Sequence, residues 1–213
     1  MMRKIALSII CLLILPCASF ALQSGPFMTT TPISLALTDL TGALTFAKFD
    51  SSLGNLTGVQ IDLSGYMTTS LTVTNCSLQS SSGTAKTELQ LTVQDAGSNL
   101  IAPTIDIFSS SFNYNLGAGE SATSGTLTKS GSSSDLYTSA AILSAFTGTG
   151  SIALTAFSFT QTWLTNTGGN TSASQITQAS LNGCITYFYD VPEPATMALL
   201  TLGGFVFRKR SRK

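Results

Sequence analysis

Residues 89–94 have the sequence Leu-Gln-Leu-Thr-Val-Gln, in which apolar and polar side chains alternate at every position. A period of two places one kind of side chain on each face of an extended chain, as in a half-buried β-strand. The same alternation recurs at residues 59–63, 71–74, 105–107 and 185–189. Within residues 151–163 the phase shifts between Leu154 and Phe157. This shift predicts a β-bulge or a strand that is buried on both faces.

Turn-forming residues separate these stretches, and no helical period is sustained through the body of the chain. Glycine, asparagine and serine cluster at residues 54–55, 80–83, 96–99, 117–119, 130–134 and 165–171. Residues 135–146 differ: they predict a short helix that is capped by Ser134 or Asp135 and ends before Gly148. Many short strands joined by such turns predict an all-β fold. We expect one antiparallel β-sandwich, jelly-roll or immunoglobulin-like, over residues 22–190.

The 10 basic and 10 acidic side chains of the 213 residues are unevenly distributed. Seven basic residues lie among the first four and last six positions, whereas residues 22–190 hold three lysines and nine carboxylates, a net charge of −6. Such a body lacks the basic face that neutralises phosphates, which argues against nucleic-acid binding. The chain has no histidine, so Ser-His-Asp and Cys-His catalysis and histidine-ligated metal sites are excluded.

The first 21 residues have the three parts of a secretory signal peptide. Residues 3–4 are Arg-Lys, residues 5–15 form an apolar core, and Pro16 ends it. Small side chains at the −3 and −1 positions predict export through the Sec translocon and cleavage by signal peptidase after Ala21. The apolar run is too short to span a bilayer, which argues against an uncleaved anchor. A proline directly before Cys17 argues against a lipoprotein.

The C-terminal end also has three parts. Val191-Pro192-Glu193-Pro194 comes first, and its prolines predict an extended, accessible peptide. Residues 195–207 carry no charge, and the chain ends with the basic side chains Arg208, Lys209, Arg210, Arg212 and Lys213. A helix of residues 195–207 would be about 20 Å long, shorter than the ~30 Å hydrocarbon core. We therefore expect a marginal transmembrane helix with a cytoplasmic stop-transfer tail; the alternative is a disordered basic tail.

This end resembles the PEP-CTERM sorting signal of Gram-negative bacteria that produce exopolysaccharide. The resemblance rests on Val-Pro-Glu-Pro-Ala-Thr at residues 191–196, on the Leu- and Gly-containing stretch after it, and on the basic terminus. It implies that exosortase, a transpeptidase-like enzyme of the inner membrane, recognises the segment and cuts near the Pro-Glu-Pro motif. The hydrophobic stretch is at the short end for that family.

A second resemblance covers roughly residues 30–190. Phe-Asp-Ser-Ser-Leu-Gly-Asn-Leu-Thr-Gly-Val at residues 49–59 is similar to the opening of the choice-of-anchor E domain. Residues 133–150 and the Tyr-rich stretch 185–189 are similar to its later segments. That family comprises extracellular domains attached to alternative surface-sorting signals. The resemblance implies no catalytic residue for this chain.

Two cysteines, Cys76 and Cys184, remain after removal of the signal peptide. An oxidising compartment permits a disulfide between them, and both lie at ends of predicted strands. The bond would close a loop of about 108 residues and stabilise the fold by up to ~4–5 kcal/mol. The alternative is two separate thiols. A catalytic thiol is disfavoured because no histidine is available as its base.

The other chemistry-bearing side chains are scattered. The acids lie on predicted turns and outward strand positions, which favours neither a glycosidase pair nor a calcium loop. The candidates for a sugar-stacking platform are Tyr114, Tyr137, Trp163, Tyr187 and Tyr189, although rings at alternate strand positions are more often core. We expect no catalytic residue, metal or cofactor.

These observations predict a non-enzymatic exported protein. We expect transient anchoring in the inner membrane, processing by exosortase, and release to the cell surface or to an exopolysaccharide matrix. The alternative is a carbohydrate-binding module that uses surface aromatics; a hydrolase ranks last.

Overall fold

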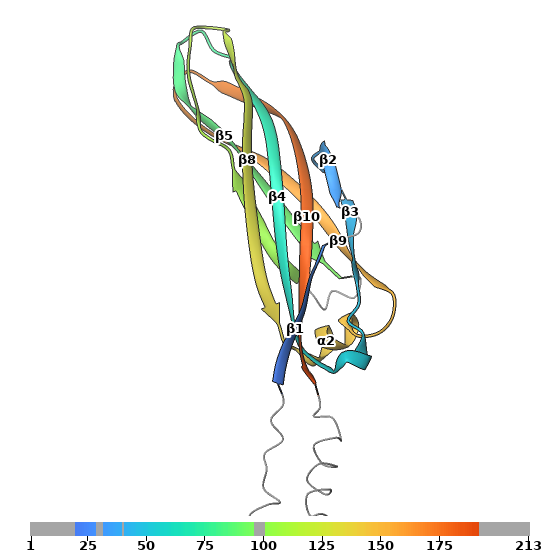
Figure 1. The fold of residues 1–213 in the computed structure, drawn as a ribbon. Helices are drawn as coiled ribbons and strands as arrows, with labels where there is room; N and C mark the ends of the chain where they lie inside the picture. The colour runs from blue at the N-terminus through green and yellow to red at the C-terminus, as the bar shows by residue number, and fades with distance from the viewer. Residues whose placement is uncertain (1–19, 29–31, 40, 96–100, 192–213) are drawn as a thin grey trace, which may run out of the picture.

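The structure is a computed structural model that describes residues 20–28, 32–39, 41–95 and 101–191. In this part of the chain two β-sheets form a sandwich (Figure 1). Sheet A consists of β1 (Phe20–Met28), β2 (Ile33–Leu37), β4 (Asn55–Asn75), β8 (Ser121–Tyr137) and β10 (Thr171–Val191). Sheet B consists of β3 (Thr41–Ala47), β5 (Ser81–Gln94), β6 (Ile101–Phe108), β7 (Phe112–Leu116) and β9 (Ser151–Gly168). The 3-10 turn η1 (Ser51–Leu53) and the helix α2 (Ala140–Phe146) lie outside the sheets.

Every strand pair in the two sheets is antiparallel. In sheet A, β10 and β4 are central, β8 is one edge, and β1 and β2 share the other side of β10. In sheet B, β9 and β5 are central, β3 lies beside β9, and β6 and β7 share the other side of β5. The prediction of a single all-β antiparallel sandwich is confirmed.

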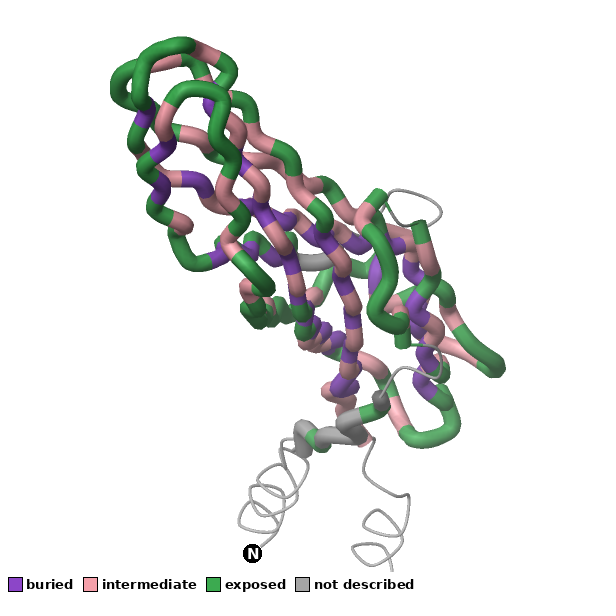
Figure 2. Tube along the Cα trace, turned by 90° about the horizontal axis from the view of Figure 1, so that it is seen from above, coloured by how far each residue is buried: buried purple, intermediate pink, exposed green. Residues whose placement is uncertain are grey.

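The alternation in the sequence determines which side chains enter the core. Along β4 the odd-numbered side chains from Ile61 to Val73 point inward and are buried, while the even-numbered ones remain partly or fully exposed. The stretches 59–63 and 71–74, predicted as separate strands, are parts of this one strand. The strands β5 and β10 show the same alternation of buried and more exposed positions, drawn as purple and pink in Figure 2. The faces turned away from the core are therefore free to carry polar or binding side chains.

A buried layer of hydroxyl groups lies between two hydrophobic clusters. The larger cluster includes Phe46, Ile61 and Leu91, and the smaller one includes Leu71 and Tyr114. Between them Thr69 is hydrogen-bonded to Thr87 (Oγ1···Oγ1 3.1 Å) and to Thr177 (Oγ1···Oγ1 2.8 Å), and all three are buried. These threonines come from three different strands, so the layer links both sheets.

The predicted helix is present but shorter than expected. Asp135 and Tyr137 belong to β8, where they pair with Ile61 and Val59 of β4. The helix α2 starts only after Ser139, which makes no side-chain cap hydrogen bond, and not after Ser134 or Asp135. Tertiary pairing with β4 thus overrides the local helix signal of residues 135–139.

Two further local predictions are wrong. The Ser-rich residues 130–134 form no turn but continue β8, paired with residues 62–66 of β4. Residues 151–163 form no bulge, because β9 pairs with β3 and β5 in unbroken register. Nor is β9 buried on both faces there, since Phe157 and Phe159 are exposed. The phase shift in the sequence arises because these two aromatic side chains point away from the core.

Candidate functional site

The two ends of the described chain pair with each other in sheet A. In the antiparallel register of β1 and β10, Phe20 lies opposite Val191 and Ala21 lies opposite Asp190. Figure 1 shows the start of β1 and the end of β10 side by side at one end of the sandwich. We call this the terminal end. The predicted signal-peptidase site and the first residue of the sorting motif are thus neighbours.

The strand β10 ends at Val191, the residue before Pro192. Pro192, Glu193, Pro194, the hydrophobic segment 195–207 and the basic tail lie outside the described residues, as does the signal peptide up to residue 19. Among the described helices, none is long and apolar enough to cross a membrane.

A cluster of aromatic rings fixes the terminal end. The ring of Tyr187 lies 5.7 Å from that of Phe27 in β1, 5.6 Å from that of Phe49 and 6.4 Å from that of Phe146 in α2. The hydroxyl group of Tyr187 donates a hydrogen bond to the carbonyl oxygen of Ala47 (2.7 Å), and burial raises its pKa. Gly54 approaches the carbonyl oxygen of Asp190 so closely that a side chain would clash, and its φ of +151° suits glycine.

The predicted disulfide is not formed: Cys76 and Cys184 are both free thiols. Cys184 does not begin β10 but lies well inside it, opposite Asp62 of β4. Cys76 follows the far end of β4, after Asn75. At about 3.3 Å per residue the two are separated by roughly 45 Å along the strand, whereas a disulfide needs Cα atoms within ~7 Å. Cys76 is exposed, and burial together with the nearby Asp62 raises the pKa of Cys184.

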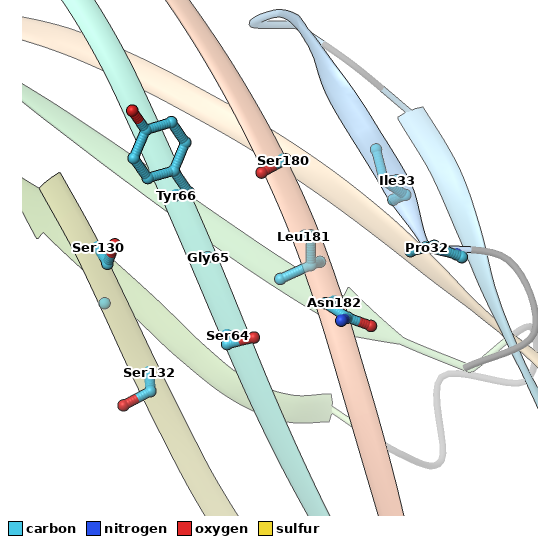
Figure 3. A pocket seen from close by; sticks show the side chains of 11 residues that line it. Pro32, Ile33, Ser64, Gly65, Tyr66, Ser130, Ser132, Ser180, Leu181 and Asn182 are labelled. Atoms are coloured by element: carbon cyan, nitrogen blue, oxygen red, sulfur yellow. The ribbon is translucent and has the colours of Figure 1, made fainter. Parts of the chain in front are cut away.

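The outer face of sheet A is hollowed where its side chains are short. A cavity of about 510 Å³ lies over β4, β8 and β10, beside β2 (Figure 3). Its polar lining consists of Ser64, Tyr66, Ser130, Ser132, Ser180 and Asn182. Neither a carboxylate nor a lysine nor a thiol lines this cavity. Its hydroxyl and amide groups can hydrogen-bond a polar ligand, but they offer no acid–base chemistry.

A second cavity of about 540 Å³ continues the first toward the terminal end. It contains one carboxylate, Asp62, which accepts hydrogen bonds from Gln60 (Nε2···Oδ1 3.0 Å) and from Ser134. No second carboxylate lines this cavity, so it lacks the pair that glycoside hydrolysis uses. Within the described ranges, no group of three or more cysteine and acidic side chains is placed to hold a metal ion.

Of the five candidates for sugar stacking, two are buried. Tyr114 and Tyr187 belong to the core, and Tyr137 and Tyr189 pack against it, which is the commoner place for rings at alternate strand positions. Trp163 is exposed on the outer face of sheet B. It is joined there by residues that the sequence analysis did not select, Phe108, Phe157 and Phe159. The phase shift in residues 151–163 was the signal that could have found two of them.

Comparison with known proteins identifies the C-terminal segment. Residues 190–213 match the PEP-CTERM protein-sorting motif. This motif implies an exported protein that passes the membrane and has exosortase as its processing partner. No curated protein matches the chain.

Two solved structures of infectious bursal disease virus show weak similarity. The Gx strain structure is 9% identical over 92% of this chain and 48% of the viral chain, with a TM-score of 0.20. The Gt strain structure is 11% identical over 91% of this chain and 48% of the viral chain, with a TM-score of 0.12. This chain therefore spans about half the length of those proteins, and TM-scores this low support no inference about fold or function.

Proposed function

We propose that this exosortase-sorted chain is a non-enzymatic protein of the cell surface or of the exopolysaccharide matrix. Signal peptidase cuts after Ala21, and the segment 195–207 with its basic tail holds the precursor in the inner membrane. Exosortase then cuts within Val191–Pro194 and releases the sandwich. The observation that carries this proposal is the sorting motif at residues 190–213, whose first two residues are the last two of β10.

The register of β1 and β10 supports this route. Because Ala21 and Asp190 are paired, both membrane-directed segments adjoin the same end of the sandwich. Cleavage at both sites removes only the outermost residues of β1 and β10, and the buried core of the described residues lies between residues 44 and 187. Processing is therefore compatible with a sandwich that is already folded.

We also propose that residues 22–190 form a choice-of-anchor E-like domain, on the resemblance of residues 49–59. In the structure this segment has a defined role at the terminal end. Phe49 contacts both Tyr187 and Tyr189, and the side chain of Asp50 accepts a hydrogen bond from the backbone nitrogen of Ser52 (2.9 Å) at the start of η1. Gly54 then passes close to Asp190. Residues of this motif thus hold the strand that leads into the sorting signal.

Intact-mass measurement of the protein from native cells tests the proposal. We expect a chain that begins at Leu22 and ends within Val191–Pro194. In a strain without exosortase, and in a Pro192→Ala/Pro194→Ala variant, we expect a longer chain that is retained with the membrane. A wild-type chain that still ends at Lys213 would contradict exosortase processing.

The second candidate function is a carbohydrate-binding module that uses surface aromatics. The observation that favours it is the exposure of Trp163 beside three exposed phenylalanines on one sheet face. Binding would keep the released protein in a polysaccharide matrix, so the two candidates are compatible.

A further inference from the structure

The outer face of sheet B carries four large aromatic side chains in solvent. Phe159 is 57% exposed, Trp163 51%, Phe108 42% and Phe157 37%. The register places them on one face, because Lys86, Gln90 and Thr92 of β5 lie opposite Trp163, Phe159 and Phe157, and Glu88 lies opposite Phe108. The intervening β5 side chains, such as Leu89 and Leu91, point into the core. We call this set of four rings the aromatic face.

Polar partners hold part of the aromatic face in place. The Trp163 indole nitrogen donates a hydrogen bond to the Glu88 carboxylate (Nε1···Oε2 2.6 Å), and the same oxygen accepts one from Gln161. The Lys86 ammonium group lies 4.7 Å from the ring centre of Phe108 and 5.8 Å from that of Trp163. A ring that is oriented before binding loses less conformational freedom when a ligand stacks on it.

The spacing of the rings indicates an extended ligand. Phe157, Phe159 and Trp163 follow one another along β9, two and then four residues apart. At about 3.3 Å per residue they span roughly 20 Å along the strand. Such a row can contact several consecutive units of a linear polymer and exceeds what a single monosaccharide covers.

The chemistry of the face suits a neutral sugar polymer. A pyranose ring has an apolar C–H face that stacks on an aromatic ring and hydroxyl groups that need hydrogen-bond partners. Beside the rings lie Gln90, whose amide donates to Asp106 (Nε2···Oδ1 3.0 Å), and the Glu88–Gln161 pair. Lys86, Glu88 and Asp106 give the face a net charge of −1, and residues 22–190 carry −6. Like charge therefore disfavours a polyanion.

We infer that the aromatic face is a binding site for a linear, neutral polysaccharide that lies along β9. This inference rests on the proposed function, which brings the released protein into an exopolysaccharide matrix, and it names the site and the ligand class there. The cavity on sheet A lacks such a row, because Tyr66 is the one aromatic side chain that lines it.

Tryptophan fluorescence reports on this site directly, because Trp163 is the single tryptophan of the chain. We would titrate the exported protein, purified from culture, with hydroxyethylcellulose, with cello-oligosaccharides of increasing length and with alginate. We expect the tryptophan emission to change with hydroxyethylcellulose and with the longer oligosaccharides, and to stay constant with glucose and alginate. Sedimentation with insoluble cellulose gives a second reading that does not depend on fluorescence.

Matched variants separate this face from the rest of the molecule. Phe159→Ala should weaken binding by about tenfold or more, the size of effect that loss of one stacking ring has in proteins that bind single-stranded nucleic acids. Trp163→Phe should retain part of the affinity that Trp163→Ala loses. Ile176→Ala, which removes an exposed apolar side chain from sheet A, should bind as the wild type does. Thermal unfolding confirms that each variant is folded.

Three results would overturn the inference: no binding of the wild type to any neutral polymer, wild-type affinity in both Phe159→Ala and Trp163→Ala, or self-association of the wild type that Phe159→Ala abolishes. The last result would assign the face to a second copy of the chain. Each is distinguishable from failure of the proposed function, which is read from the mass of the exported chain. Release of reducing sugar from the polymer would contradict the non-enzymatic proposal alone.

Discussion

Ala21 of β1 and Asp190 of β10 are paired residues in sheet A, although 168 positions of the chain lie between them. The first and last strands of the sandwich are therefore hydrogen-bonded neighbours in the same sheet. The pairing of β1 with β10 cannot form until the last strand is available. After cleavage at Ala21, residues 22–28 remain as a short strand that covers the side of β10 opposite β4.

Phe27→Ala tests how strongly β1 is held. The ring of Phe27 lies 5.7 Å from that of Tyr187, and loss of an aromatic pair with part of its buried area should lower the free energy of unfolding by about 1 kcal/mol. Urea unfolding of the processed protein measures this. Leu78→Ala is the control, because this side chain is almost fully exposed and should change little. Equal stability of Phe27→Ala and the wild type would show that β1 is not held by this contact.

A pair of glycines sets the distance between the sheets. Gly65 of β4 lies opposite Gly131 of β8. Gly65 faces Leu91 of β5 and Ile107 of β6, and Gly131 faces β6. A Cβ atom at Gly131 would lie 2.8 Å from Ile107 Cγ1 and 2.9 Å from Ile105 Cγ2. Gly131→Ala should therefore destabilise the fold by about 1–3 kcal/mol through overpacking.

A double variant identifies the cause. Ile107→Ala removes the Cγ1 atom that the new methyl group would meet. The double variant Gly131→Ala/Ile107→Ala should therefore lose less stability than the sum of the two single variants, because contacting sites are not additive. Ser132→Ala, the next residue on β8 with its side chain on the outer face, should be close to neutral. If the double variant loses the sum of the two single effects, the contact between residues 131 and 107 does not cause the destabilisation by Gly131→Ala.

The buried threonine layer gives a third prediction. Thr69→Val removes the hydroxyl group that is shared by Thr87 and Thr177 and leaves both with one partner fewer. An unsatisfied buried hydroxyl costs on the order of 1–3 kcal/mol. The triple variant Thr69→Val/Thr87→Val/Thr177→Val should lose less than the sum of the three single variants, because it leaves fewer hydroxyls unpaired. Additive losses in urea unfolding would contradict a coupled network.

Alternation in the sequence was sufficient to predict strands, the inward side chains of β4 and β5, and the sandwich. It did not identify strand partners, since a period of two defines faces but not neighbours. For that reason a disulfide between Cys76 and Cys184 was compatible with the sequence, although the register of β4 and β10 places the two residues far apart along the strands. The run Ser130–Ser134 has the composition of a turn, yet its backbone hydrogen-bonds along β4 as an edge strand.

The candidate binding face was only partly predictable. Trp163 was one of five aromatic residues considered for sugar stacking, whereas the phase shift at Phe157 and Phe159 was interpreted as a β-bulge or a strand buried on both faces. Phe108 follows Ile105 and Ile107 on β6, and only the register with Glu88 places it on the same face as Trp163. Side chains from separate strands are brought together by the sheet, and the sequence alone carries no record of that pairing.

The raised pKa values of two tyrosines, Tyr137 and Tyr187, predict that the fold loses stability at high pH. Burial, with a contribution from the nearby carboxylate of Asp135, raises the pKa of Tyr137 to about 12, and burial also raises the pKa of Tyr187. In the unfolded chain tyrosine has a pKa of about 10, so above that pH the unfolded state binds fewer protons than the native state. The contribution of these two tyrosines to the free energy of unfolding should therefore be constant below about pH 10 and should fall as the pH rises to about 12 and beyond. Urea unfolding between about pH 8 and 12 measures the free energy of unfolding, and tyrosinate absorbance recorded in parallel measures the ionisation of the tyrosines.

Variants of the two tyrosine sites test the cause. Tyr187→Phe should be less stable at neutral pH, because it loses the hydrogen bond to Ala47, and its stability should depend less on pH in the alkaline range. Asp135→Asn should bring the pKa of Tyr137 part of the way back toward its ordinary value, because burial remains the larger cause of the shift. A wild-type stability that does not change up to pH 12 would show that neither phenol is held in its protonated form by the fold.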